Sequence, residues 1–236
     1  MKVVVYTALI GDIDRLWSVL PGSDGIQHVA FVDTPKREVG LWGGKSPTIV
    51  SGTAGQITAR PAWEQCVVEP EWGNRRTARH YKALPHRYLP YADVWIWMDA
   101  NVRPRMPAQA LTRYMTAGLV TFNHWRRQCL YKEASECIRQ RKDGRDVLEA
   151  QAARYRRAGM PRNWGLAATR IVIRRNTEPI QALNEAWWAE IERGSVRDQV
   201  SLPFVSWRAG MRWGALPGTC KPGNSDSRWL YLGHRA

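Results

Sequence analysis

The segment of the 236-residue chain with the most chemical information runs from residue 74 to residue 104. Its second half contains a short β-branched and aromatic run, Val94–Met98, which ends abruptly at Asp99-Ala100-Asn101. A run of this length between turn residues is typical of a strand buried on both faces. Open α/β sheets bind ligands at the carboxyl ends of their strands, so we expect Asp99 to lie where a metal ion or substrate group would bind.

Cationic side chains precede this strand at helical spacing. Arg75, Arg79, Lys82 and His86 follow the pattern i, i+4, i+7, i+11, which predicts one shared helix face. Pro85 would kink that helix or start a second one. A cationic face leading to a carboxylate suits a ligand that carries phosphate and a divalent cation. The ordinary alternatives are a solvated Arg/Lys stripe and a carboxylate that caps a helix or turn.

The remaining apolar segments predict the elements that must position these residues. We expect further strands at residues 2–10, 28–32, 64–69, 119–122 and 170–173. We expect helices at residues 13–20, 107–116, 131–158, 177–193 and 199–209, with a break at Asp143-Gly144 inside the third. Residues 36–73 show little periodicity, and we assign no chemistry to them.

The composition is that of a basic globular protein. The chain has 35 Lys and Arg against 21 Asp and Glu, a formal net charge of +14, and 13 tryptophans. This charge attracts polyanions such as nucleic acid or an anionic membrane surface, and the indole rings could stack on bases or sugars. No apolar stretch approaches the roughly 18 residues of a membrane span, and the first residues do not resemble a signal peptide. We therefore expect a cytoplasmic protein with reduced cysteines.

Several of these segments together resemble a known family. The chain resembles the glycosyltransferase-like family called DUF616 first in the segment Asn74-Arg75-Arg76-x-x-Arg79-x-x-Lys82-x-x-Pro85-His86, which is followed by Trp97-Met98-Asp99-Ala100-Asn101. Later matches come in the same order: His124-x-x-Arg127-x-Cys129-x-Tyr131-x-Glu133-Ala134, Gly165-Leu166, and Arg197-Asp198-Gln199-x-Ser201-Leu202. That family is itself similar to nucleotide-sugar transferases of GT-A architecture.

The resemblance implies a fold and an activity. The fold would be α/β and GT-A-like (Rossmann-like), with a mixed, mostly parallel sheet flanked by helices. We expect a single domain over residues 1–236, with a donor-binding half at about 1–104 and an acceptor and catalytic half at about 105–236. The implied reaction moves a sugar from a nucleotide-diphosphate sugar to a hydroxyl acceptor. That acceptor is either a glycan or lipid-linked saccharide, or a hydroxylated base in DNA.

On the donor side, the resemblance nominates residues at the ends of the first two strands and on the cationic helix: Tyr6, Thr7, Gly11, Asp33, Arg75, Arg79, Lys82 and Asp99. The implied cofactor is Mn²⁺ or Mg²⁺, held by Asp99 and Asn101 with His234 as a third ligand, for which His124 competes. GT-A enzymes usually carry Asp-x-Asp at this motif. Asn101 can coordinate a cation through its carbonyl oxygen, but it lowers the ligand charge by one.

On the acceptor side, the resemblance nominates His124, Arg127, Gly165, Arg197 and Gln199. Asp198 is the expected catalytic base, together with Asp99 at the leaving group. The structural alternative for Asp198 is an N-cap of the helix that follows it. Because Asn101 replaces a carboxylate, a second function stays open: a catalytically inactive, basic nucleic-acid-binding protein that keeps the fold. A metal-dependent phosphohydrolase is a third possibility, but the chain offers few ligands for a two-metal site.

Overall fold

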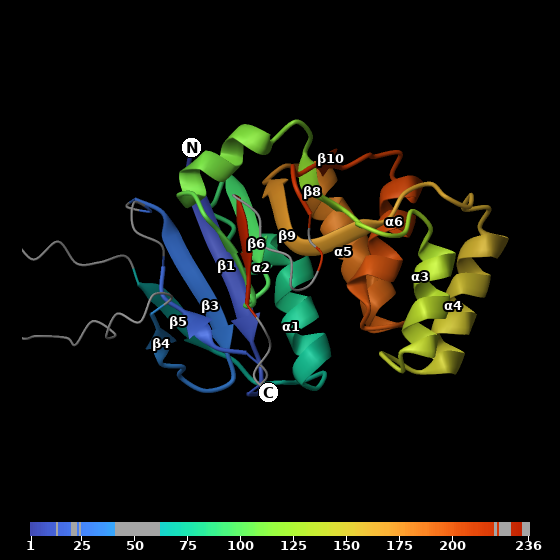
Figure 1. Cartoon of the computed structure of the whole chain (residues 1–236), viewed down its shortest axis with the longest axis horizontal. Helices are drawn as coiled ribbons and strands as arrows, with labels where there is room; N and C mark the ends of the chain where they lie inside the picture. Colours follow the sequence, from blue (N-terminus) through green and yellow to red (C-terminus); the bar gives the residue numbers. More distant parts are fainter. Residues whose placement is uncertain are drawn as a thin grey trace, which may run out of the picture.

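The computed structural model describes residues 1–12, 14–19, 23, 25–40, 62–219, 221 and 228–232. Its centre is a seven-stranded sheet with the order β10-β8-β9-β6-β1-β3-β5 (Figure 1). The strands are β1 (Val3–Leu9), β3 (Gln27–Val32), β5 (Trp63–Val67), β6 (Val94–Met98), β8 (Leu119–Asn123), β9 (Ala167–Arg175) and β10 (Gly214–Ala215). Strands from both predicted halves of the chain therefore enter one sheet.

The sheet is mixed and mostly parallel. Strand β1 pairs in parallel with β3 and β6, β3 with β5, and β10 with β8. Only β9 runs the other way, between β6 and β8. The first residues of β9 consequently lie beside the carboxyl end of β6, where the Asp99 amide donates to the Arg170 carbonyl at 2.8 Å. This topology confirms the predicted α/β fold class.

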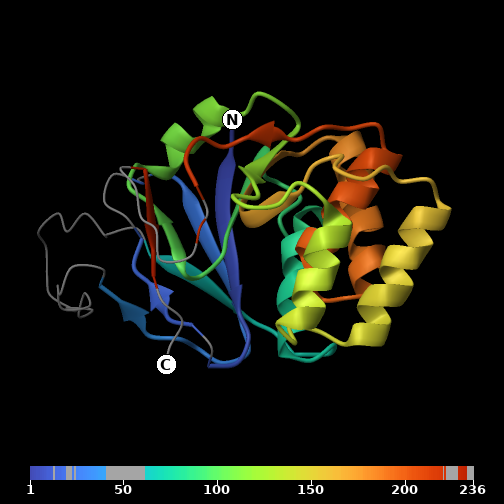
Figure 2. The same cartoon turned by 45° about the vertical axis from the view of Figure 1, so that its right-hand side comes forward.

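Helices cover one face of the sheet (Figure 2). Helices α1 (Asn74–Ala83), α5 (Glu178–Glu192) and α6 (Asp198–Arg208) pack against one another and the strands. Helices α3 (Leu130–Arg139) and α4 (Arg145–Arg157) form a pair that contacts this layer through α6. The short α2 (Pro85–Tyr88) begins directly after α1, so Pro85 starts a second helix.

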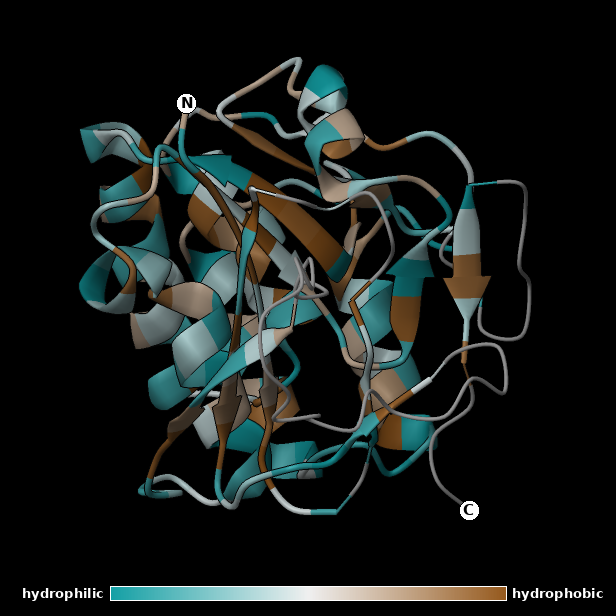
Figure 3. Ribbon diagram, turned by 90° about the vertical axis from the view of Figure 1, so that its left-hand side faces the viewer, coloured by the Kyte–Doolittle hydropathy of each residue, from teal (hydrophilic) through white to brown (hydrophobic). Residues whose placement is uncertain are grey.

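Shorter elements cover the other face. They are the 3₁₀ helix η1 (Ala108–Tyr114) and two small sheets, one of β2 (Leu16–Trp17) with β4 (Glu38–Val39), the other of β7 (Val102–Pro104) with β11 (Trp229–Tyr231). In β1, Val4 and Tyr6 join the hydrophobic cluster on the helical side, while Val5 and Leu9 join the opposite one. The apolar strands lie between more polar outer elements (Figure 3), as expected of a sheet buried on both faces.

Most predicted elements are confirmed within a few residues, including the break at Asp143-Gly144. The helix predicted at residues 13–20 is wrong: its described part contains β2, which pairs with β4. A helix of two turns is marginal alone, whereas here the Trp17 carbonyl accepts a hydrogen bond from the Trp63 indole at 2.8 Å. The helix predicted at residues 107–116 forms, but as the tighter 3₁₀ type. None of the described helices combines the length and apolarity needed to cross a bilayer.

Candidate functional site

A cleft of about 600 Å³ opens at the edge of the sheet where β1, β6 and β8 end and β9 begins. Because β9 is antiparallel, its first residues join the carboxyl ends of its neighbours at this edge. The main wall segments are residues 8–11 after β1, 74–79 of α1, 99–101 after β6, 124–127 after β8, and 197–199 at the start of α6. The α/β fold thus gathers here the residues that the sequence places at strand ends.

Four charged side chains meet at the floor of the cleft: Arg79, Asp99 and Asp198 line it, and Lys82 is buried directly beneath them. The Lys82 ammonium lies 2.6 Å from Asp198 Oδ2 and 3.4 Å from Asp99 Oδ1. Arg79 Nε lies 3.4 Å from Asp198 Oδ1. Thr169 donates its hydroxyl proton to Asp198 Oδ2 at 2.7 Å. We call Arg79, Lys82, Asp99 and Asp198 the charged quartet, and its two cations balance its two carboxylates.

Burial makes the central ion pair strong. The side chains of Lys82 and Asp198 are only 1% and 3% exposed. Burial alone would raise the pKa of the Asp198 carboxyl, but Arg79, Lys82 and the Thr169 hydroxyl hold that pKa well below its usual range. Burial lowers the pKa of Lys82, and the two carboxylates oppose that shift. Asp198 is therefore ionised at neutral pH.

Tyr6 positions Lys82 from inside the core. Its hydroxyl donates to the Lys82 carbonyl at 2.9 Å, and the buried Arg174 donates to the same oxygen at 2.5 Å. Burial raises the pKa of Tyr6 to about 12. This corrects the predicted donor contacts of Tyr6 and Thr7: both side chains are fully buried, because alternate residues of β1 point into the two cores.

Gly11 lines the cleft, and Asp33 holds it there. The Gly11 amide donates to Asp33 Oδ2 at 2.8 Å, and Lys36 pairs with Asp33 Oδ1 at 2.9 Å. Gly11 has φ +79°, and a Cβ at this position would lie 2.5 Å from Asn74 Nδ2, so the turn requires glycine. Asp33 is not among the residues that line the cleft, and it fixes the turn after β1, so its contact with the donor stays a prediction.

Asp99 faces the cleft from the end of β6. Its side chain is 25% exposed, and its Oδ1 accepts a hydrogen bond from the Trp97 indole at 2.7 Å as well as the Lys82 contact. Asn101 lines the same cleft. Among the described residues, no three His, Cys, Asp or Glu side chains cluster as metal ligands. The predicted third ligand, His234, lies outside the described residues.

His124 and Arg127 form the wall beyond β8. The His124 Nδ1 accepts hydrogen bonds from the Arg126 and Arg127 amides at 3.2 and 3.0 Å. Arg127 Nε pairs with the buried Glu133 at 2.5 Å. Burial lowers the pKa of His124, against the opposing effect of Glu133. His124 is therefore uncharged at neutral pH, and its Nδ1 orders the loop instead of facing a metal.

The loop before α6 brings Asp198 into the quartet. Asp143, between α3 and α4, accepts hydrogen bonds from the Ser195 hydroxyl at 2.6 Å and the Val196 amide at 2.9 Å. The N-cap alternative for Asp198 is wrong: Arg197 occupies that position, and no side chain makes a capping hydrogen bond. Arg197 and Gln199 both line the cleft.

Gly165 is not among the residues that line the cleft, and its predicted sugar contact stays a prediction. It has φ +133°, and a Cβ here would meet the Trp213 ring at 3.2 Å. The residue therefore serves the close packing of Trp164 and Trp213, whose ring centres are 5.4 Å apart. The glycine was correctly singled out, but a neighbouring indole explains it.

The described cleft wall carries more cations than carboxylates. Its seven cationic side chains face five carboxylates, and Arg79 and Arg127 are already ion-paired. Five have no carboxylate partner within 4.0 Å among the described residues: Arg75, Arg126, Lys142, Arg170 and Arg197. Such a surplus suits an anionic ligand.

Sequence reasoning missed three neighbours of the carboxylates. Thr169 and Arg170 begin the antiparallel strand, and Trp97 donates to Asp99. Trp97 was visible in the motif before Asp99. The chain order carries no comparable signal for Thr169, because its proximity to Asp99 depends on β9 running opposite to β6.

Residues 56–214, about two thirds of the chain, match the family described as TOD1/MUCI70, glycosyltransferase-like domain. The matched segment contains the whole charged quartet. The family match confirms the prediction of a glycosyltransferase-like protein, but it does not confirm the family name DUF616. A search of curated proteins finds no match to the chain.

Proposed function

The chain belongs to the TOD1/MUCI70 glycosyltransferase-like domain family, and from this premise we propose that it transfers a sugar from a nucleotide-diphosphate sugar to a hydroxyl acceptor. The observation that carries the proposal is the charged quartet at the floor of a cation-rich cleft. Glycosyl transfer develops positive charge on the sugar and negative charge on the departing phosphate. A cleft with fixed charges of both signs suits that separation.

The donor would lie against the part of the cleft wall that comes from the first half of the chain. Its base and ribose would approach the turn at Gly11, which the cleft wall includes. Its diphosphate would lie near Arg75 and the other unpaired cations, because guanidinium groups bind phosphate oxygens in a bidentate manner. Arg79 and Lys82 contribute less free charge than their types suggest, since both are already paired with Asp198.

The cleft offers a divalent cation only a small number of protein ligands. Oδ1 of Asp99 already accepts from Trp97 and lies near Lys82, so the ligands would be Oδ2 of Asp99 and the side-chain oxygen of Asn101. Mg²⁺ is often held by one or two protein oxygens together with substrate phosphates. Asp99 and Asn101 would hold such an ion, which would supply positive charge to the leaving diphosphate. Lys82 supplies part of that charge from the protein itself.

Asp198 would act on the acceptor side of the sugar. In the transfer, the bond between the anomeric carbon and the phosphate oxygen breaks, and its electron pair leaves with the phosphate. The acceptor oxygen then forms the new bond and loses its proton. Because Arg79 and Lys82 keep the pKa of Asp198 low, we propose that this carboxylate orients the acceptor hydroxyl and stabilises the cationic sugar. The departing phosphate is the final proton acceptor.

The test is a donor-cleavage assay with the purified chain. Release of nucleoside diphosphate is measured from UDP-, GDP- and ADP-sugars, and of nucleoside monophosphate from CMP-sugars, each with and without Mn²⁺. One donor should be cleaved, and Asp99→Ala should lower the rate about 100-fold, the scale of one lost transition-state interaction. Arg37→Ala, an exposed substitution outside the cleft, is the control. Equal rates for the wild type and Asp99→Ala would refute the proposed chemistry.

A second candidate function is a nucleic-acid-binding protein that has kept the fold without catalysis. The five unpaired cleft cations favour it, since a polyanion would be attracted with or without a donor. The same assay separates the two functions. A non-catalytic protein would cleave no sugar nucleotide at any Mn²⁺ concentration, and Asp99→Ala would leave nucleic-acid binding unchanged.

A further inference from the structure

A second basic hollow lies next to the cleft. Its volume is about 480 Å³, and it is lined by residues along the length of α3, at the end of α4 and in the loop beyond α4. Its cationic residues are Lys132, Arg139, Arg156 and Arg162, and its one carboxylate is Glu136. Glu136 also lines the cleft, so the two hollows share a wall at α3.

The shared wall carries little net charge. Arg139 donates to both oxygens of Glu136, at 2.9 Å from Nε and 2.6 Å from Nη2. These hydrogen bonds lower the pKa of Glu136 to about 2, so the carboxylate stays ionised and compensated by its partner. Lys132, Arg156 and Arg162 form no ion pair among the described residues. The second hollow therefore keeps three cations without a carboxylate partner among the described residues.

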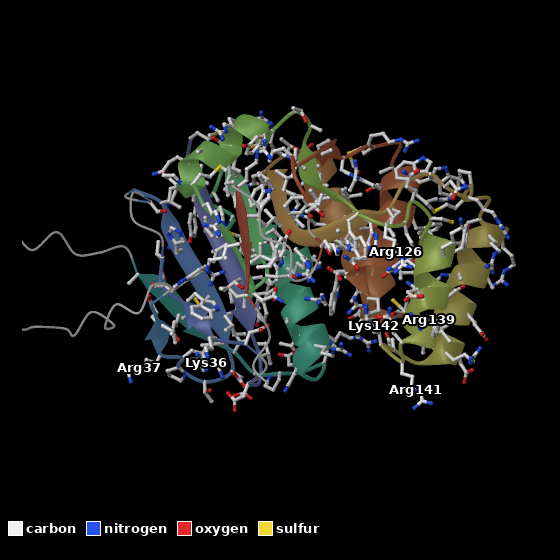
Figure 4. The ribbon with its side chains drawn as sticks, in the orientation of Figure 1. Lys36, Arg37, Arg126, Arg139, Arg141 and Lys142 are labelled. Carbon is white, nitrogen blue, oxygen red and sulfur yellow. The ribbon has the colours of Figure 1, made fainter. Side chains whose placement is uncertain are left out.

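The cations between the hollows lie on one flank of the molecule. Figure 4 shows Arg126, Arg139 and Lys142 on the α3 side, while Lys36 and Arg37 lie near the strands at the other end. Arg141 points away from this flank. We call Arg126 and Lys142 of the cleft, together with Lys132, Arg156 and Arg162 of the second hollow, the basic track.

An exposed aromatic ring stands at the cleft end of this track. Trp125 is 42% exposed although it lines the cleft. The Arg126 guanidinium and the Lys221 ammonium lie 6.0 and 5.7 Å from its ring centre, and the His124 ring stacks on it with centres 5.8 Å apart. Because 42% of Trp125 stays accessible beside these groups, the indole can stack on a base, and the arginines offer bidentate partners to phosphates.

We propose that the acceptor is a single-stranded nucleic acid whose backbone follows this track, with a base at Trp125 and phosphates in the second hollow. This inference rests on the proposed function, because the strand is an acceptor only if the chain transfers a sugar. The binding surface itself is argued from the contacts above and does not depend on the transfer. A single strand suits the site because its bases can leave their stack and enter a cleft at little cost. An exposed indole next to guanidinium groups suits a base beside its phosphates, and a carboxylated glycan is the competing ligand that the experiment includes.

The experiment measures binding of a fluorescein-labelled 12-nucleotide DNA by fluorescence anisotropy between 50 and 200 mM salt. The test variant is Lys132→Ala with Arg162→Ala, which removes two exposed charges from the second hollow and no cleft residue. The matched control is Arg37→Ala with Arg113→Ala, which removes two exposed charges from the opposite side. Circular dichroism verifies that both variants fold.

The test variant should bind about tenfold more weakly and lower the slope of log K against log salt by roughly 1.4, since each phosphate contact on a single strand contributes about 0.7. The control should keep the wild-type slope. Equal losses of slope in the two variants would refute the proposal that the nucleic-acid backbone follows the basic track. Tighter binding of a carboxylated polysaccharide than of the oligonucleotide would overturn the choice of acceptor.

A parallel thermal-shift measurement with the sugar nucleotides separates this inference from the proposed function. A chain that binds donor but no oligonucleotide refutes the nucleic-acid acceptor alone. A chain that binds the oligonucleotide along the track but no donor supports the binding surface and refutes the glycosyl transfer.

Discussion

Replacing Lys82 by methionine should destabilise the fold far more than an ordinary lysine substitution. The Lys82 ammonium is 1% exposed and lies 2.6 Å from Asp198 Oδ2, which is equally buried. In Lys82→Met the Asp198 carboxylate keeps Arg79 at 3.4 Å and the Thr169 hydroxyl, but loses its nearest cation. The substitution therefore leaves a buried charge only partly compensated.

The expected loss follows from the geometry. At 2.6 Å and an effective dielectric constant of about 20, the attraction between the two charges is about 6 kcal/mol. Part of it offsets the desolvation of the lysine, which methionine does not incur. Breaking one side of a buried pair typically costs about 3–5 kcal/mol, and we expect the free energy of unfolding to fall by that amount.

A double-mutant cycle in guanidinium chloride tests the reasoning. The variants are Lys82→Met, Asp198→Asn and the double variant, with Lys2→Met as an exposed control. Because the double variant buries neither charge of this pair, it should be more stable than the sum of the single losses predicts by about 2 kcal/mol or more. A loss below about 1 kcal/mol in Lys82→Met, or strict additivity, would refute the buried ion pair.

The same variant should unfold at higher pH in acid. The folded pKa of Asp198 lies below its unfolded value, so its stabilising contribution is present above a pH of about 4 and disappears as the pH falls through the folded value. Removing Lys82 raises the pKa of Asp198 in the folded state, so the stabilising contribution of this carboxylate is lost at a higher pH. The midpoint of acid unfolding in Lys82→Met should therefore move upward, whereas an unchanged midpoint would contradict the cause assigned to the shift.

The remaining predictions concern ligand affinity, backbone strain and thiol reactivity. Arg75→Ala should weaken nucleoside diphosphate binding about tenfold in calorimetry, or about 1.4 kcal/mol, and leave nucleoside binding unchanged. Equal losses of affinity for the diphosphate and the nucleoside, or the same loss in Arg37→Ala, would exclude a phosphate contact. Gly11→Ala should lower the free energy of unfolding by at least about 1–2 kcal/mol, because of its positive φ and the close Asn74 amide; an unchanged denaturation midpoint would contradict this. Burial raises the pKa of Cys137 to about 11, so its thiol should resist a disulfide reagent at pH 8 until the chain unfolds, and rapid labelling of the folded protein would show that the burial is wrong.

The sheet and the carboxyl edge of β6 could be predicted because their signals are local. Val94–Met98 is uniformly apolar and ends at a polar turn, so both the strand and the exposed Asp99 follow from pattern alone. The cationic stripe was also local, but its members have different environments. Arg75 at the start of α1 is exposed, whereas Lys82 near its end is buried under the sheet edge.

The charged quartet could not be predicted from spacing, because its partners come from distant parts of the chain. Asp198 meets Lys82 only after α3, α4, β9 and α5 have returned the chain to the same edge. The contacts of Tyr6 and Asp33 could not be predicted for a related reason. Tyr6 donates to the Lys82 carbonyl and Asp33 accepts from the Gly11 amide, and both partners are distant in the sequence.

The central claim is that the cleft binds a sugar nucleotide through its diphosphate. Isothermal titration of wild-type protein with UDP-, GDP- and ADP-sugars in the presence of Mn²⁺ tests it most directly. We predict that one donor binds with a stoichiometry of about one and is displaced by its nucleoside diphosphate. Absence of heat for every donor, from protein that is folded by circular dichroism, would contradict the claim.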